Sequence, residues 1–153
     1  MWEILLLHVG RISDEGIGRT VERYVKMVGG EWRFRVEPVR ASRKKEPQAC
    51  KTEEAGFLAR RIPKGCMAVA LDPGGRTMDS EGFAGLLQRQ KDAGKRVAFL
   101  VGGPHGLGRE ALDLADIRLS LSPMTLTHDM ATLVLAEQVY RAFAHCTGRA
   151  YAK

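Results

Sequence analysis

The most informative part of this chain is the run Val97-Ala98-Phe99-Leu100-Val101-Gly102-Gly103-Pro104-His105-Gly106-Leu107-Gly108. Its first five residues are apolar and predict a buried strand; the glycine-rich remainder predicts a loop, with a short helix beginning near Gly108. A second short strand, over residues 117–121, runs into the loop 122–127 and then into a long apolar helix over about 128–146. Because ligands of open α/β sheets bind at the carboxyl ends of strands, we expect a small-molecule pocket at these two loops.

The bulk properties are those of a globular protein. With 153 residues the chain is long enough for a substantial core, and we expect residues 1–153 to form a single domain. No apolar stretch reaches the length of a membrane span, and residues 1–8 predict a first strand because they lack the features of a secretory signal. Cys50, Cys66 and Cys146 are odd in number and widely spaced. We therefore expect a cytoplasmic protein with no disulfide scaffold, no metal and no membrane partner.

The charge balance is moderately basic, with 24 Lys and Arg residues against 18 Asp and Glu and a formal net charge of +6. Basic residues are dense between Arg19 and Lys64, although glutamates are interspersed among them and weaken the local field. Arg43-Lys44-Lys45, in a stretch of loop composition, is the most pronounced cluster. Two interpretations stay open: a solvated surface, or a patch that contacts the phosphates of a nucleic acid.

Strand and helix signals alternate along the chain. Apolar and charged residues alternate over 32–37, which predicts a half-exposed strand at the edge of a sheet. Ser13 is expected to cap the first helix, and Pro47 fits the first turn of the next one. The third strand is expected over 66–71, closed by a turn at 72–75. Strands separated by helices predict an α/β fold with a mostly parallel sheet flanked by helices.

The glycines also permit another interpretation. Gly106-Leu107-Gly108-Arg109-Glu110-Ala111 matches the dinucleotide fingerprint G-x-G-x-x-A, which is typical of nicotinamide-dependent oxidoreductases. The motif lies so late in the chain, however, that a complete βαβαβ half does not fit after it. No Gly-Lys-Ser/Thr follows, which excludes a P-loop. His105 and His128 lie in the expected pocket loops, where each is either a catalyst or a hydrogen-bonded loop residue.

Three motifs, in this order and at this spacing, resemble the bacterial RlmH family of SPOUT-class methyltransferases. They are LVGGPHGL at 100–107, LSLSPMTLTH at 119–128 and LAEQVYRAF at 135–143. The chain length, the end of the first strand at His8-Val9-Gly10 and the Leu71-Asp72 pair fit the same family. Its members methylate N3 of a pseudouridine in helix 69 of 23S rRNA, so the resemblance implies this activity, on the ribosome, for the present chain.

The resemblance also implies a SPOUT fold with a deep trefoil knot in the C-terminal third, an exception to the general avoidance of knots. It implies a homodimer and S-adenosylmethionine as methyl donor, held mainly by backbone groups. The interpretation from the residues agrees, because glycine permits close approach of a backbone. The residues implied to contact the cofactor are Leu71, Gly102, Leu121, Ser122, Pro123, Met124, Thr125 and Leu126.

Three further residues are candidates for handling the target base. Arg141 is expected to stabilise the anion that develops on the imide, with a salt-bridged helix residue as the alternative. His128 is a candidate as base or as loop clamp. Tyr151 is expected to position the base, or to belong to a frayed tail. The chain carries Ala152 where family members commonly have histidine, which favours a second hypothesis: a non-catalytic ribosome-binding or RNA-binding protein that retains the fold.

Overall fold

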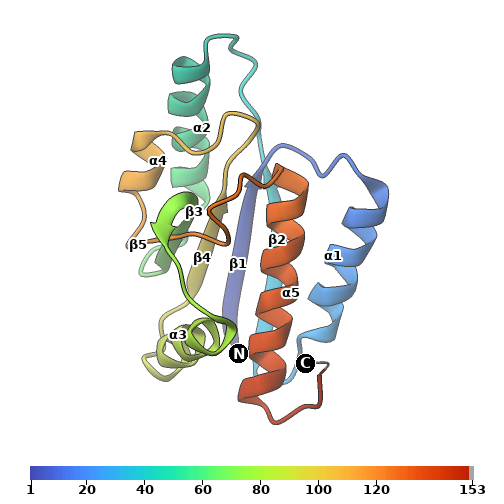
Figure 1. Cartoon of the computed structure of the whole chain (residues 1–153). Coiled ribbons are helices and arrows are strands. Elements are labelled where there is room, and N and C mark those ends of the chain that lie inside the picture. The colour runs from blue at the N-terminus through green and yellow to red at the C-terminus, as the bar shows by residue number, and fades with distance from the viewer. Residues whose placement is uncertain (152–153) are drawn as a thin grey trace.

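The computed structural model describes residues 1–151, and within them the strands form one five-stranded sheet in the order β2-β1-β4-β3-β5 (Figure 1). Every pair of neighbouring strands is parallel, and parallel strands must be joined by crossovers, which the helices provide. The α/β fold with a parallel sheet is therefore confirmed, as is the edge position of β2. The strands are β1 (Trp2–Val9), β2 (Trp32–Val39), β3 (Met67–Arg76), β4 (Val97–Val101) and β5 (Ile117–Leu119).

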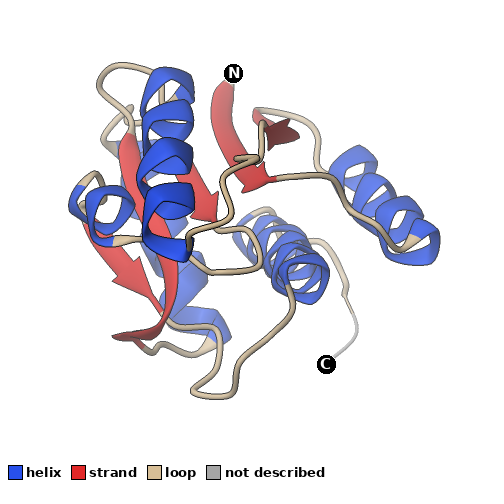
Figure 2. Cartoon of the chain, turned by 90° about the horizontal axis from the view of Figure 1, so that it is seen from above, coloured by secondary structure: helices blue, strands red, loops and turns tan. Residues whose placement is uncertain are grey.

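Helices cover both faces of this sheet, as the view from above shows (Figure 2). One buried cluster joins the sheet to α1, α3 and α5, and a second joins it to α2 and α4. The five helices of the described residues are α1 (Glu15–Met27), α2 (Pro47–Arg61), α3 (Ser80–Asp92), α4 (Arg109–Asp113) and α5 (His128–Cys146). None of them is long and apolar enough to cross a membrane.

The apolar run of β1 follows from this layering. Ile4 and Leu6 pack in the cluster on the α1, α3 and α5 side, whereas Leu5 and Leu7 pack on the α2 and α4 side. Successive side chains of a strand point to opposite faces, so a strand covered on both faces is apolar at nearly every position. His8 falls on the same side as Ile4 and Leu6, which directs it toward α5.

Two sequence-based boundaries were wrong. The cap of α1 is Asp14 rather than Ser13, since the Asp14 carboxylate accepts a hydrogen bond from the N–H of Ile17 at 2.9 Å. The turn expected at 72–75 lies inside β3, which continues to Arg76.

The continuation of β3 depends on its glycines. The pairing with β5 shifts register between Leu71 and Arg76, which marks a bulge in β3. A Cβ added to Gly75 would lie 2.7 Å from the carbonyl carbon of Arg118, so only glycine allows β3 to return against β5 at this point. Residues 72–75 have the composition of a turn, but the pairing of β3 with β5 on either side of them keeps them within the strand.

The C-terminal part of the chain crosses the sheet through β4, α4 and β5 before α5 lies beside α1 (Figure 1). This path brings the loop after β4 and the loop before α5 to the same edge of the sheet. The trefoil knot implied by the resemblance stays a prediction.

Candidate active site

A cavity of about 1080 Å³ lies at the carboxyl ends of β1 and β4, beside Leu71 to Pro73 in the middle of β3. Cofactor and ligand sites commonly have volumes of about 300 to 1,000 Å³, so this cavity is at the upper end of that range. The pocket predicted from the two loops is confirmed, and the segment after β1 forms a third wall that was not expected. The walls of the cavity are formed by residues within the ranges 9–17, 71–73, 101–112 and 121–131, and by Ala41.

The loop after β4 has a conformation that requires glycine. A Cβ on Gly102 would lie 2.5 Å from the carbonyl carbon of Gly106 and 2.7 Å from the nitrogen of Leu107. The Gly106 N–H closes the turn by donating to the Gly103 carbonyl at 2.9 Å, and Gly106 has φ +75°. Because the obstructing atoms are backbone, no side-chain adjustment makes room at Gly102.

A buried carboxylate lies next to the loop after β4. Glu54 of α2 is 4% exposed, and its Oε2 accepts a hydrogen bond from the Ser42 N–H at 2.9 Å. A Cβ on Gly103 would lie 3.5 Å from Glu54 Oε1. Glu54 thus anchors the loop after β2 and lies beside Gly103 of the glycine loop. The sequence did not reveal it, since a glutamate on a helix normally indicates a solvated face.

The loop before α5 forms the opposite wall. The Ser122 Oγ accepts a hydrogen bond from the Met124 N–H at 3.0 Å, and Thr127 caps α5 by accepting from the Met130 N–H at 3.3 Å. Of the eight residues expected at a cofactor, Pro123 does not line the cavity. The seven that do are Leu71, Gly102, Leu121, Ser122, Met124, Thr125 and Leu126.

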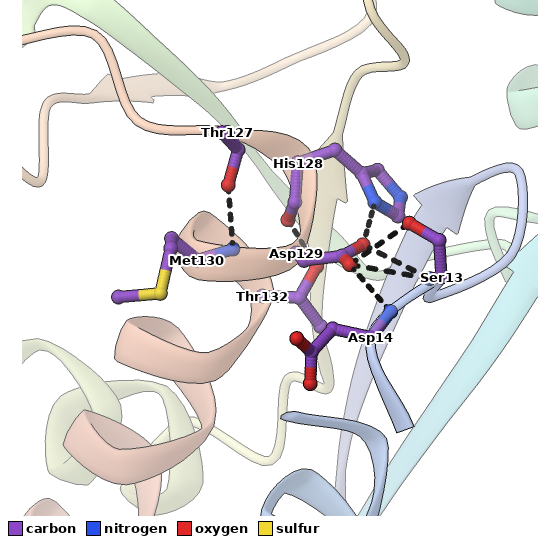
Figure 3. Close-up of polar contacts among 7 residues, drawn as sticks. All are labelled: Ser13, Asp14, Thr127, His128, Asp129, Met130 and Thr132. Carbon is purple, nitrogen blue, oxygen red and sulfur yellow. Dashed lines mark hydrogen bonds and ion pairs between the residues drawn. The ribbon is translucent and has the colours of Figure 1, made fainter. Parts of the chain in front are cut away.

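A polar cluster joins the start of α5 to the segment after β1 (Figure 3). The Asp129 carboxylate accepts hydrogen bonds from the Ser13 Oγ at 3.1 Å and from the N–H groups of Ser13 and Asp14 at 3.2 and 3.0 Å. The Nδ1 of His128 lies 3.0 Å from Asp129 Oδ1. The His128 and Asp129 side chains are only 12% and 13% exposed. These contacts fasten two walls of the cavity to each other.

Burial alone would raise the pKa of the Asp129 carboxyl, but hydrogen bonds from His128, Asp14 and Ser13 hold it below its ordinary value. His8 lies on the inner side of this cluster, its ring centroid 5.2 Å from that of His128. Burial, followed by the proximity of His128, lowers the pKa of His8 to about 4. Within the described residues, His8 Nδ1 and His128 Nε2 are both buried without a hydrogen-bond partner.

The pKa of His8 predicts a pH-dependent stability. Unfolded, this histidine binds a proton near its ordinary pKa of 6.5, whereas in the folded protein it does so only near 4. The unfolded state therefore binds more protons between these values, and stability falls as the pH falls through this range, by up to about 3 kcal/mol. Urea unfolding of a His8→Leu variant at pH 7 and pH 4 is expected to show that much less loss than the wild type. The control is His145→Leu, which replaces an exposed histidine. If His8→Leu and the wild type lose the same free energy of unfolding between pH 7 and pH 4, His8 is not the group responsible.

Two other predicted residues lie at the opposite end of α5. Arg141 is 13 positions beyond His128 (141 − 128), which is about 20 Å along the helix axis. Its guanidinium contacts Glu137 at 2.6 Å and lies 4.8 Å from the centre of the Tyr151 ring. The Tyr151 hydroxyl donates to Glu137 at 3.1 Å and lies 3.4 Å from that of Tyr24. Neither Arg141 nor Tyr151 lines the cavity of its own chain.

The cluster of Arg141, Glu137, Tyr151 and Tyr24 is partly buried. The hydrogen bond to Glu137 raises the pKa of Arg141, and burial followed by the contact with Tyr24 raises the pKa of Tyr151. Both groups therefore keep their protons at neutral pH. Ala152, the position of the missing histidine, lies outside the described residues.

One exposed basic residue lines the cavity, and others lie in a loop that reaches it. Arg11 is exposed and lines it, and the loop after β2 contributes exposed Arg43 and Lys45 beside Ala41, which also lines it. Lys44 in the same loop pairs with Glu53 at 3.5 Å. Within residues 1–151, no group of three His, Cys, Asp or Glu side chains is placed to bind a metal ion.

A parallel α/β sheet with a large cavity at strand-end loops is the arrangement in which α/β proteins bind small organic ligands. Comparison with known families is more specific: residues 2–151 match the family described as "Predicted SPOUT methyltransferase". The chain belongs to the SPOUT methyltransferase family.

Relatives in sequence extend this result. A protein of Gemmatimonas aurantiaca called "Ribosomal RNA large subunit methyltransferase H" is 39% identical over 152 residues, covering 98% of this chain and 99% of its own. A protein of Desulfotalea psychrophila with the same name is also 39% identical, covering 99% and 98%.

Solved structures support the fold. A probable methylase family protein from Haemophilus influenzae has a TM-score of 0.60 at 16% identity, covering 99% of this chain and 70% of its own. A probable methyltransferase from Bordetella pertussis has a TM-score of 0.58 at 20% identity, covering 92% and 95%. The SPOUT methyltransferase fold expected from the motifs is thus confirmed.

Proposed function

We propose that this protein transfers a methyl group from S-adenosylmethionine to N3 of a pseudouridine in helix 69 of 23S rRNA, in the assembled ribosome and in the cytoplasm. The observation that carries the proposal is the cavity itself. Two of the three family motifs, at 100–107 and 119–128, supply two of its walls. The relatives called ribosomal RNA large subunit methyltransferase H support the choice of substrate.

The lining of the cavity fits an adenosyl cofactor. It is built largely from strand-end loops, and the backbone at Gly102 approaches Gly106 and Leu107 of the same loop too closely for any side chain. Its volume of about 1080 Å³ leaves room for a nucleobase beside the cofactor. The residues that would hold S-adenosylmethionine are the seven expected ones that line the cavity, without Pro123: Leu71, Gly102, Leu121, Ser122, Met124, Thr125 and Leu126.

The cofactor, when bound, supplies an electrophilic methyl on its sulfonium. The protein must then align the target N3 with that methyl and help the imide proton to leave, and alignment of two reactants contributes several kcal/mol. Arg141 is the proposed stabiliser of the developing imide anion, because its guanidinium stays charged and can donate to an oxyanion. Tyr151, stacked near it, would position the base.

Arg141 lies about 15 Å along α5 from Ala131, the last residue of this helix that lines the cavity of its own chain, and Tyr151 packs beside Arg141. The proposal therefore requires a second copy to deliver them. We therefore propose a homodimer in which the Arg141 end of α5 from one copy completes the cavity of the other. Symmetric dimers of this kind hold two equivalent shared sites.

His128 acts in this proposal as a clamp and not as a base. Its Nδ1 is engaged by Asp129, and its Nε2 is buried. A general base must come within hydrogen-bond reach of the proton that it removes. Nδ1 is paired with Asp129 and Nε2 is buried, so in this arrangement neither ring nitrogen is exposed to a proton of the substrate.

Arg11 and the exposed basic residues of the loop after β2 are proposed to contact RNA phosphates. Arg43→Ala with Lys45→Ala is expected to weaken ribosome binding and to lower the dependence of log K on log salt by about one for each residue. The affinity for S-adenosylmethionine is expected to stay unchanged, because neither side chain lines the cavity.

The matched control for this pair is Lys95→Ala with Arg96→Ala, an exposed Lys and Arg at the amino end of β4, opposite the cavity. Filter binding of ribosomes over a salt series distinguishes the two pairs. Equal effects of both pairs on the slope would show that binding depends on net charge and not on this surface.

Calorimetric titration with S-adenosylmethionine tests the proposed cofactor. Saturable binding is expected of the wild type. The alternative function, a non-catalytic ribosome-binding or RNA-binding protein that retains the fold, predicts ribosome binding without methyl transfer. Failure to bind S-adenosylmethionine, alone and with ribosomes present, would favour that alternative.

A further inference from the structure

Asp129 is placed where two separate walls of the cavity meet. It stands in the first turn of α5, directly after the loop that carries Ser122 to Thr127. Its carboxylate receives the N–H groups of Ser13 and Asp14 and the Ser13 hydroxyl, all from the segment between β1 and α1 (Figure 3). The partners are separated from it by more than a hundred positions in the chain, so this contact is made only in the folded protein.

The capping of its own helix does not account for Asp129. Thr127 is the N-cap of α5 and accepts the hydrogen bond from the Met130 N–H. Asp14 likewise caps α1 with its own carboxylate. Asp129 lies at the start of α5 but accepts its hydrogen bonds from Ser13 and Asp14 at the start of α1. Its negative charge therefore also faces the positive end of α1.

His128 fixes the direction of the Asp129 side chain. Its Nδ1 lies 3.0 Å from Asp129 Oδ1, while the Ser13 hydroxyl and the Asp14 N–H approach Oδ2. The His128 ring in turn packs against buried His8 of β1. Both carboxylate oxygens are therefore engaged, and the pair is held from the sheet side as well as from α1.

We infer that Asp129 is a positioning residue of the cofactor cavity, which holds the β1–α1 segment against the loop before α5 so that both walls meet the ligand in one fixed arrangement. This inference rests on the proposed function for the identity of the ligand. Charge-assisted hydrogen bonds to a carboxylate are stronger than neutral ones, and groups that fix a site in advance reduce the ordering needed on binding.

The test compares Asp129→Asn with Asp79→Asn. Asparagine keeps the shape at position 129 but removes the charge and places an amide donor among donors. Asp79 caps α3 through the Gly82 N–H at 2.7 Å and does not line the cavity, so its variant measures the loss of a helix-start carboxylate alone. Asp129→Asn is expected to raise the Kd for S-adenosylmethionine about tenfold or more, and Asp79→Asn to leave it unchanged.

Amide hydrogen exchange supplies a second readout that does not depend on the ligand. In the wild type the Ser13 and Asp14 amides are expected to exchange slowly, and in Asp129→Asn much faster, while the core amides of β1 stay protected. Steady-state kinetics should show a higher KM for S-adenosylmethionine with kcat retained at saturation, since the residue positions and does not react.

The outcomes separate the inference from the proposed function. If the wild type does not bind S-adenosylmethionine, the proposed function fails, and the exchange of the Ser13 and Asp14 amides still decides whether Asp129 fastens the two walls. If the wild type binds and Asp129→Asn binds equally well, the inference is overturned. Unchanged exchange at Ser13 and Asp14 in the variant would overturn it as well.

Discussion

Replacing Gly102 with alanine or valine is expected to abolish measurable binding of S-adenosylmethionine, raising its Kd by at least about 100-fold, or nearly 3 kcal/mol. The first added carbon would already lie 2.5 Å from the carbonyl carbon of Gly106. Because Gly106 and Leu107 contact it with backbone atoms, the whole loop must move, and that loop is a wall of the cavity. Alanine should therefore be nearly as damaging as valine.

The control for Gly102 is Gly29→Val, between α1 and β2, where an added Cβ meets no atom within 4 Å. Calorimetry and thermal unfolding of both variants measure affinity and stability separately. A Gly102→Val protein that remains folded and binds S-adenosylmethionine with the wild-type Kd would place the cofactor elsewhere.

Arg141→Ala is expected to lower the rate of methyl transfer by about 10²- to 10³-fold, the usual effect of removing one preorganised donor to a developing anion. The affinity for S-adenosylmethionine should not change, since the proposed role of Arg141 is toward the imide of the target base and not toward the cofactor. Transfer from labelled cofactor to ribosomes under single-turnover conditions separates the chemical step from binding.

The shared site makes a sharper expectation about mixtures. A dimer of one Gly102→Val subunit and one Arg141→Ala subunit contains one cavity with both defects and one with neither. Coexpression of the two inactive variants should then restore about a quarter of wild-type activity, because half of the dimers are mixed and each has one intact site.

Lys91→Ala is the matched control for Arg141→Ala. Lys91, on α3, is likewise a partly buried cation, and it pairs with Glu31 at 2.9 Å. When Lys91→Ala is coexpressed with Gly102→Val, active sites are expected in the mixed dimers and also in the homodimers of Lys91→Ala. Mixtures of Gly102→Val and Arg141→Ala that stay inactive although mixed dimers form would refute the delivery of Arg141 by the partner copy.

Much of the fold was predictable because local patterns and tertiary packing agree. The run before Gly102 is apolar on both faces, as a central parallel strand must be, and β4 indeed lies between β1 and β3. The alternation over Trp32 to Glu37 correctly indicated an edge strand. The position of the cavity followed from the same strands, because parallel strands place their carboxyl ends together.

Other features depend on partners that no local pattern reveals. Asp72-Pro73-Gly74-Gly75 has turn composition, yet pairing with β5 keeps it within β3. Ser13 and Asp14 are both good caps, and the choice of Asp14 leaves the Ser13 hydroxyl for Asp129, 116 positions away. An acidic residue in the first turn of a helix normally indicates only the helix dipole, which concealed the role of Asp129. The separation of Arg141 from the cavity required the full length of α5 to be placed in space.

The most direct test of the central claim is methyl transfer to ribosomes that lack the modification. Purified protein, S-adenosylmethionine and such ribosomes are incubated together, and the RNA is digested and analysed by mass spectrometry. One added methyl on N3 of a pseudouridine in helix 69 is expected with the wild type, and none with Gly102→Val. Ribosome binding without any added methyl, in protein that binds the cofactor, would contradict it.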